Sequence, residues 1–277
     1  MIRGTTRLIP VFGQPTATVK APMIYNPWFE AHGIDAVVIP MECGSGDFPN
    51  LLRLVFRLGN AGGAIATMPH KVSAAGLVDR LSKRARIAGS VNAVRLAADG
   101  ALEGDLFDGE GFVAGMVAKG VSPLGRSALV VGAGGVGSAI SASLAEAGVA
   151  RLALYDPDEA TRDALAERLV AALPGLVVHA GSRDPSGFDI VVNASPLGMR
   201  PSDPLPVDAD ALSPSTFIGE VVMSREITPF LEEARARGCV FQVGTDMLFE
   251  QIPAYLEFFG FGRPSVAELR RAATIRY

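Results

Sequence analysis

Cysteine and charge are both scarce in this chain of 277 residues. The two cysteines, Cys43 and Cys239, allow at most one disulfide, and no signal peptide precedes them. This usage is typical of free thiols in a reducing compartment, so we expect a cytoplasmic protein. Charged residues make up 19% of the chain, the formal net charge is -4, and the basic residues are scattered. A nucleic-acid groove needs a basic stripe, so we expect no nucleic-acid partner.

Long hydrophobic runs are also scarce, with one near exception at residues 127–145, which carry no charge. This stretch is rich in Gly, Ala and Ser, whereas a membrane-spanning helix is dominated by larger apolar residues. We therefore expect a strand, a turn and a helix there, and no membrane partner. Metal-ligand spacing is missing as well, because His70 has neither His32 nor His179 near it in the sequence. We expect no metal site.

The composition that remains suits an α/β protein with many short turns. Hydrophobic residues make up 49% of the chain, with 31 Gly and 19 Pro, and the length fits two modest domains. The expected strands are residues 8–12, 36–40, 64–67, 128–131, 152–155, 176–179, 190–193 and 217–221. The expected helices are 23–32, 48–58, 71–81, 112–119, 138–147 and 159–173, with a mostly helical tail over 246–277. The β-α-β-α-β-α order of the first hundred residues predicts parallel pairing through crossover helices.

A glycine-rich turn follows the expected strand 128–131. Gly132, Gly134 and Gly137 form G-x-G-x-x-G, with a helix of small residues after them. The first glycine permits a tight turn, the second lets the backbone approach a pyrophosphate, and the third lets helix and strand pack closely. Amide N–H groups at the helix start favour an anion. The predicted dinucleotide-binding residues here are Gly132, Ala133, Gly134, Gly135, Val136 and Gly137. The alternative is a glycine-rich turn that binds nothing.

The choice of dinucleotide rests on Asp156, which lies 19 residues after Gly137 at the end of the next expected strand. An acid at this place bonds the hydroxyls of the adenosine ribose. Its charge repels a 2′-phosphate, and no arginine follows among Pro157 and Asp158. We therefore expect NAD as cofactor, with NADP possible. The alternative role for Asp156 is that of a helix N-cap, and the two roles can coexist.

Several further segments match one family in order along the chain. They are ATMPHK (66–71), GSVNAV (89–94), GDLFDGEGF (104–112), NASPLGM (193–199) and GTDMLFEQIPAYLEFFG (244–260). Together with GAGGVG, they make the sequence resemble the shikimate/quinate dehydrogenase family. The resemblance implies an α/β fold of two domains. A substrate-binding domain would comprise residues 1–104 and 240–277, with the C-terminal helices returning to it, and a Rossmann NAD(P)-binding domain would comprise residues 105–239.

The function that the resemblance implies is reversible hydride transfer between NAD(P) and a ring hydroxyl or ketone of shikimate, quinate or a related cyclic hydroxy acid, in aromatic amino acid biosynthesis. The family's acid–base pair matches Lys71 and Asp108. Oxidation of an alcohol needs such a group, because the hydroxyl proton leaves as the hydride departs. The alternative for Lys71 is a solvated surface lysine. Family positions that bond substrate hydroxyls match Thr67, Asn92 and Gln251, and further cofactor positions match Asn193, Met199 and Gly244. We expect a monomer or a homodimer.

The departures from the family pattern gather around the substrate. Val19 and Ala21 stand where the family has two hydroxyls that hold the substrate carboxylate. Other polar family positions are occupied here by Ile65, Leu106, Phe107 and Met223. Lys20 is a candidate replacement for the carboxylate partner, although in an extended strand it would point away from its neighbours. Its alternative is a solvated lysine. A less polar alcohol or ketone as substrate, or a non-catalytic NAD-binding regulatory protein, are the alternative functions.

Overall fold

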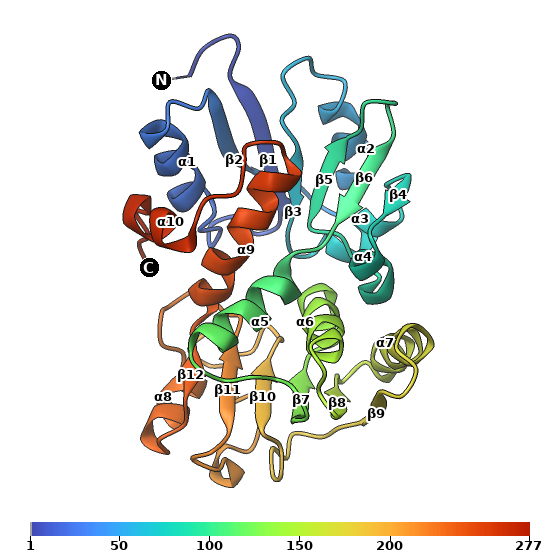
Figure 1. Ribbon diagram of the computed structural model, residues 1–277, viewed down its shortest axis with the longest axis vertical. Helices are drawn as coiled ribbons and strands as arrows, with labels where there is room; N and C mark the ends of the chain where they lie inside the picture. Colours follow the sequence, from blue (N-terminus) through green and yellow to red (C-terminus); the bar gives the residue numbers. More distant parts are fainter. Residues whose placement is uncertain (1) are drawn as a thin grey trace. The chain divides into compact units, whose positions relative to one another are not determined.

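The computed structural model describes residues 2–277, and these divide into two compact units (Figure 1). Unit 1 comprises the residues up to Arg86, together with Ser90–Phe107 and Gln251–Arg276. Unit 2 comprises Ile87–Gly89, Asp108–Glu250 and Tyr277. The boundaries follow residues 107 and 250, whereas the sequence predicted them after 104 and 239. Each unit has its own sheet, so the expected fold class is confirmed.

Unit 1 contains a mixed sheet in the order β2-β1-β3-β5-β6-β4. Its strands are β1 (Arg7–Gly13), β2 (Ala36–Glu42), β3 (Ala64–Ala66), β4 (Arg80–Leu81), β5 (Ala93–Leu96) and β6 (Leu102–Asp105). β1 pairs in parallel with β2 and β3, but β5 is antiparallel to both β3 and β6. The parallel pairing predicted for the strands at 8–12, 36–40 and 64–67 is therefore confirmed, whereas β5, β6 and their antiparallel pairing were missed. The missed hairpin turns at Asp99-Gly100, where Gly100 has φ 88°, and Asp-Gly is a strong hairpin signal.

Helices of unit 1 pack on this sheet and on one another. They are α1 (Pro22–Ala31), α2 (Phe48–Val55), α3 (Lys71–Ala75), α4 (Lys83–Ala88), α10 (Val266–Ala272) and the second part of α9 (Gly244–Phe258). The helix expected over 71–81 is wrong in length, because α3 ends before Gly76 and Arg80–Leu81 pairs with β6 instead. The sequence also favours Pro69 as the first residue of this helix, which is wrong because α3 starts after His70.

Unit 2 contains a fully parallel sheet in the order β12-β11-β10-β7-β8-β9. Its strands are β7 (Ser127–Val131), β8 (Arg151–Tyr155), β9 (Val177–Ala180), β10 (Ile190–Asn193), β11 (Phe217–Glu220) and β12 (Phe241–Gln242). Counted from β7, this is the doubly wound order 3-2-1-4-5-6. The order reverses between β7 and β10, which is where such sheets bind ligands beyond the carboxyl ends of their strands.

Both faces of the second sheet are covered, as a parallel sheet requires. The helices of unit 2 are α5 (Asp108–Ala118), α6 (Gly135–Glu146), α7 (Glu159–Ala172), α8 (Pro229–Ala236) and the start of α9, with a short 3-10 turn η1 (Ala209–Ala211). One face buries Leu129 and Ile218 against Phe230 of α8. On the other face Gly219 lies so close to Phe112 of α5 that a Cβ there would be 2.3 Å from the ring.

Candidate functional site

The glycine-rich turn lies at the switch point of unit 2, between β7 and α6. Gly132 has φ 107°, and a Cβ on it would lie 2.7 Å from the carbonyl carbon of Ala194, which follows β10. A Cβ on Gly137 would lie 1.8 Å from the Gly132 carbonyl oxygen. Gly134 differs, because nothing lies within 4 Å of its Cβ position. Two glycines therefore permit close backbone packing, and the third leaves the backbone open to a ligand at the start of α6.

Asp156 follows β8 and stabilises this turn through hydrogen bonds. Its carboxylate accepts hydrogen bonds from the N–H groups of Ala133 at 2.8 Å and Asp158 at 2.9 Å. The N-cap of α7 is Asp158, which accepts from the N–H groups of Ala160 and Thr161. The alternative role of Asp156 as a helix N-cap is therefore wrong.

Asn193 ends β10 and shapes the loop that follows it. Its side-chain amide donates to the carbonyl of Leu197 at 2.9 Å and to Glu220 Oε1 at 3.0 Å. Its Oδ1 accepts from the N–H and the Oγ of Ser195. The loop then turns at Gly198, and the Met199 N–H bonds the Pro196 carbonyl. The side chain of Asn193 is thus fully used within the protein.

Glu220 is a buried residue of this region that the sequence analysis missed. It ends β11, and its carboxylate accepts from the N–H groups of Val221 and Val222 and from Thr228 Oγ1. Burial raises the pKa of Glu220 to about 7, against the opposing effect of these hydrogen bonds. The available signal was an acid that interrupts the apolar stretch Phe217–Val222. Gly244, the first residue of α9, lies beside it, since a Cβ there would be 2.5 Å from the Val222 carbonyl oxygen.

The two residues predicted as the acid–base pair are both buried at helix starts. Lys71 is the first residue of α3 in unit 1 and is 9% exposed, so the alternative of a solvated surface lysine is wrong. The preceding His70 is fully buried, stacks on Phe48 with ring centroids 4.3 Å apart, and bonds the Cys43 carbonyl through Nε2 at 2.9 Å. Asp108 is the first residue of α5 in unit 2 and is 2% exposed.

The residues predicted to bond substrate hydroxyls lie in unit 1. Asn92 is fully buried, and its Oδ1 accepts from the Phe107 N–H at 3.1 Å. Within residues 2–277, Asn92 Nδ2 and Gln251 Oε1 are buried without a hydrogen-bond partner. Thr67 is half-buried directly after β3. An unsatisfied buried polar atom costs about 1–3 kcal/mol, and these two atoms have hydrogen-bonding capacity that the described residues do not use.

Lys20 lies between a turn closed by the bond from the Val19 N–H to the Thr16 carbonyl and Ala21, which has helical dihedrals ahead of α1. The extended geometry considered for it is therefore wrong. Its alternative as a solvated lysine is also wrong, because it is 8% exposed and its Nζ donates to the Arg276 carbonyl.

Most of the apolar departures from the family pattern are buried. Ile65, Leu106 and Phe107 are at most 6% exposed. The Phe107 ring packs on those of Tyr255 and Phe258, with centroids 4.8 Å and 5.7 Å away. An aromatic cluster therefore occupies this part of unit 1.

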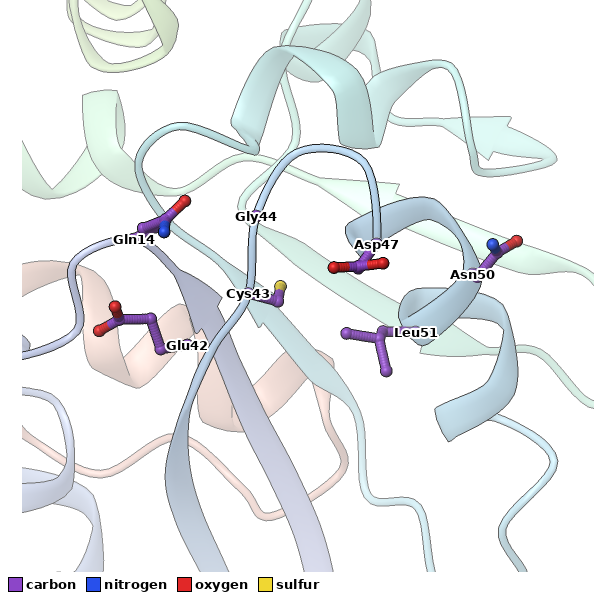
Figure 2. A pocket seen from close by; sticks show the side chains of 7 residues that line it. All are labelled: Gln14, Glu42, Cys43, Gly44, Asp47, Asn50 and Leu51. Atoms are coloured by element: carbon purple, nitrogen blue, oxygen red, sulfur yellow. The ribbon is translucent and has the colours of Figure 1, made fainter.

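A shallow pocket of about 540 Å³ opens in unit 1 where β1 and β2 end (Figure 2). In Figure 2, Gln14 and Glu42 lie on one side of Cys43 and Asp47 and Leu51 on the other. Both cysteines are free, and burial raises the pKa of the Cys43 thiol. None of the catalytic, substrate-binding or cofactor-binding residues predicted from the sequence lines this pocket.

Across the described part of the chain no cluster of metal-ligating side chains occurs. Over that same part, every helix falls short of the length and apolarity needed to cross a membrane.

The fold and the glycine turn place this chain in a general class of proteins. It has two α/β units, and the second has the Rossmann topology of dinucleotide-binding proteins. Comparison with known families agrees. The profile of the shikimate dehydrogenase substrate binding domain matches residues 11–94, and that of the ThiF family matches residues 122–170.

Relatives of the whole chain define the family. A shikimate dehydrogenase (NADP(+)) of Acidiphilium cryptum is 36% identical over 94% of this chain and 93% of its own. The structure of shikimate 5-dehydrogenase from Listeria monocytogenes, in complex with shikimate and NAD, superposes with a TM-score of 0.86 at 26% identity, covering 98% and 97% of the two chains. Quinate dehydrogenase from Corynebacterium glutamicum, in complex with NAD, gives 0.84 at 30% identity, covering 96% and 98%. The chain belongs to the shikimate dehydrogenase family and is a shikimate dehydrogenase-like oxidoreductase, as the sequence predicted.

Proposed function

We propose that this protein transfers a hydride reversibly between NAD(P) and a ring hydroxyl or ketone of shikimate, quinate or a related cyclic hydroxy acid. The observation that carries the proposal is the glycine turn at the switch point of unit 2, with an open backbone at Gly134. The Listeria relative, whose structure holds shikimate and NAD, supports the substrate class. In this proposal unit 1 binds the substrate, unit 2 binds the dinucleotide, and the enzyme acts in the cytoplasm as a monomer or homodimer.

The residues of unit 2 fit a dinucleotide. The N–H groups at the start of α6, next to the open space at Gly134, would hold the pyrophosphate, where the helix dipole favours an anion. Asp156 would take the ribose hydroxyls. Met199 and Gly244 would contact the rest of the cofactor, together with the backbone of Asn193, whose side chain is already bonded. The bound nicotinamide would supply the hydride chemistry.

The residues of unit 1 would orient the substrate and move its proton. We propose that Asn92 Nδ2, Gln251 Oε1 and the Thr67 hydroxyl bond the ring hydroxyls, because the first two atoms are buried and unsatisfied within the described residues. Lys71 would take the hydroxyl proton in oxidation and return it in reduction, with Asp108 as its acidic partner. Both are buried, which suits a proton transfer shielded from bulk water.

Cofactor preference follows from Asp156. A carboxylate held at this place by two N–H groups repels a 2′-phosphate, so we propose that NAD is used better than NADP. The relatives named as NADP(+) enzymes make this a sharp test. Values of kcat/KM measured with both nucleotides would contradict the proposal if NADP were favoured. Asp156→Ser combined with Pro157→Arg should shift the ratio toward NADP.

The substrate is tested with a panel of shikimate, quinate, aminoshikimate and simpler alicyclic alcohols, each with NAD and NADP. Reduction of either nucleotide by any of the cyclic acids supports the proposal. A second candidate, a less polar alcohol or ketone, is favoured by the buried Ile65, Leu106 and Phe107. Activity on the neutral alcohols alone would select it.

The substrate carboxylate is the group for which Lys20 is proposed. Its charge could replace two neutral hydroxyls, because charge-assisted hydrogen bonds are about twice as strong as neutral ones. The Lys20→Met variant is compared on an acid and on its neutral alcohol analogue. A loss confined to the acid supports the role, and equal losses contradict it.

A further inference from the structure

The carboxylate of Glu220 joins separate segments at the carboxyl edge of the sheet in unit 2. Oε1 accepts from Asn193 Nδ2 at 3.0 Å and from the N–H groups of Val221 at 2.8 Å and Val222 at 3.0 Å. Oε2 accepts from Thr228 Oγ1 at 2.8 Å. All four donors are neutral groups, and they come from the end of β10, the segment after β11 and the N-cap of α8. One buried side chain thus fixes three pieces of backbone.

The first of these pieces leads to the glycine turn. Asn193, held by Glu220, bonds Ser195 and Leu197 and so sets the course of residues 194–199. This loop touches the turn, since a Cβ on Gly132 would be 2.7 Å from both the carbonyl carbon and the oxygen of Ala194. The position of the loop beside Gly132 therefore depends on the Asn193 side chain, and that side chain depends on Glu220.

The second piece leads to the start of α9. The Val222 N–H is bonded to Glu220, and the Val222 carbonyl oxygen would lie 2.5 Å from a Cβ on Gly244. Loop 194–199 and Gly244 are two of the segments proposed above to contact the dinucleotide beyond its pyrophosphate. Glu220 belongs to neither segment, but it bonds Asn193, which precedes the loop, and Val222, which lies against Gly244.

We propose that Glu220 is a positioning residue of the dinucleotide site, which holds residues 194–199 and the start of α9 in the arrangement that binds the cofactor. The inference rests on the proposed function, because it presupposes that unit 2 binds a dinucleotide. A buried carboxylate is costly to keep in a fold, and a fully bonded buried polar group confers one defined arrangement on its surroundings. Without it, the binding-competent arrangement would be less populated, and the apparent Kd would rise by the inverse of that population.

The test is a direct titration of the full chain with NAD, followed by fluorescence or calorimetry at pH 6 and pH 8. NAD is the probe because it lacks the 2′-phosphate, which itself titrates near neutral pH. In Glu220→Ala the Asn193 amide loses one of its two acceptors, and the Kd should rise about tenfold or more, the equivalent of one net hydrogen bond. An unchanged Kd in a folded Glu220→Ala protein would overturn the proposal.

Glu220→Gln keeps the shape of the side chain and an acceptor for Asn193, but it has no charge. Charge-assisted hydrogen bonds are stronger than neutral ones, so its Kd should exceed that of the wild type by about threefold to tenfold at pH 8. With a pKa of about 7, the wild-type carboxyl should be largely protonated at pH 6, and the ratio should approach one. Other groups that titrate, including Asp203 and Asp246 on the neighbouring segments, affect both proteins alike, so they do not change the ratio of the two Kd values. Neither of these acids bonds Glu220. A ratio of one at both pH values overturns the proposal even if Glu220→Ala does not fold, whereas a ratio above one at pH 8 supports it.

Asp189→Asn is the matched control. Asp189 precedes β10 and bonds the N–H and Oγ of Ser127 at the start of β7, so it joins β10 to its other neighbouring strand at the opposite end of the strands. Its loss should change the NAD Kd by no more than about twofold. An equal effect from both acids would make the role of Glu220 merely structural. Failure of the wild type to bind either nucleotide would instead overturn the proposed function.

Discussion

The side chains proposed to bind the cofactor and those proposed to bind the substrate differ in how their buried polar groups are bonded. In unit 2 the side chains around the switch point are bonded to the protein itself: Asp156 to two N–H groups, and Asn193 to Ser195, Leu197 and Glu220. In unit 1, by contrast, Asn92 Nδ2 and Gln251 Oε1 are buried and have no partner among the described residues. Elsewhere in unit 2, Ser141, Ser224 and Gln242 also have buried atoms without a partner, so the difference is confined to the proposed site residues. Among these, the cofactor side chains are bonded in advance, whereas two substrate side chains keep a polar atom for a ligand to bond.

The strongest test of this contrast is Lys71→Ala in unit 1. We expect kcat to fall by about 10²–10⁴, the usual contribution of a positioned acid–base group. The Kd for NAD should stay the same, because Lys71 lies in unit 1 and the glycine turn in unit 2. Steady-state kinetics and a nucleotide titration on the same preparation measure both. Near-full kcat in the variant would remove Lys71 from the mechanism.

The built-in network of unit 2 should show itself in the pH dependence of stability. The pKa of Glu220 is raised from 4.5 to about 7 in the folded protein, so the folded state holds its proton more tightly than the unfolded state does. Its contribution to the free energy of unfolding is therefore full below pH 4.5 and is lost as the pH rises through 7. The loss should reach about 3 kcal/mol by pH 8.

Urea denaturation of the wild type and Glu220→Gln from pH 4.5 to pH 8 measures this loss, because glutamine does not titrate. The stability difference between the two proteins should shift toward the variant as the pH rises. Parallel curves would show that the carboxyl titrates in the fold as it does in the unfolded chain.

Substitutions at Gly134 and Gly137 distinguish the effect of backbone packing from the effect of ligand access in the glycine turn. Gly137→Ala places a Cβ 1.8 Å from the Gly132 carbonyl oxygen, and such overpacking should lower the free energy of unfolding by about 1–3 kcal/mol. Gly134→Ala meets open space, so its stability should change by less than about 0.5 kcal/mol. It should nevertheless weaken NAD binding, because the methyl group occupies the approach of the pyrophosphate. Unimpaired NAD binding by a stable Gly134→Ala protein would place the phosphates elsewhere.

The smallest expected effect concerns Gln251. Because its Oε1 has no partner among the described residues, Gln251→Met should leave the free energy of unfolding unchanged or slightly raised. The KM for the substrate should rise about tenfold, the equivalent of one hydrogen bond, while the KM for NAD stays constant. A drop in stability with unchanged KM values would assign Gln251 to packing instead.

Sequence patterns predicted the parallel half of the molecule better than the mixed half. In unit 2 most strands are short apolar runs between turn signals, and β10 was predicted to the residue. The two-residue β12 and helix α8 were missed. In unit 1 the hairpin β5–β6 was missed, although Asp99-Gly100 indicates a tight turn, because β-α alternation was extended too far. The helix after Lys71 was predicted too long for the same reason.

Site residues divide in the same way. The glycine turn has a fixed spacing with one physical purpose per residue, so a single sequence reveals it. Glu220 has no such local signature: its partners include Asn193, 27 positions earlier, and a contact of that kind exists only once β10 and β11 lie side by side. The burial of Lys20 could not be predicted either, since it depends on a carbonyl 256 positions away.

One feature of unit 1 bears on how the chain acquires its structure during synthesis. Helix α1 packs against α10, Phe29 contacts the ring of Phe261, and the Thr274 N–H bonds the Met23 carbonyl. The residues of unit 2 fall between these partners in the chain, so they leave the ribosome before α10 does. Because domains fold as units during synthesis, usually the N-terminal one first, we expect this chain to reverse that order. Unit 2 should fold first, and the side of α1 that packs on α10 should stay exposed until residues 251–276 have been synthesised.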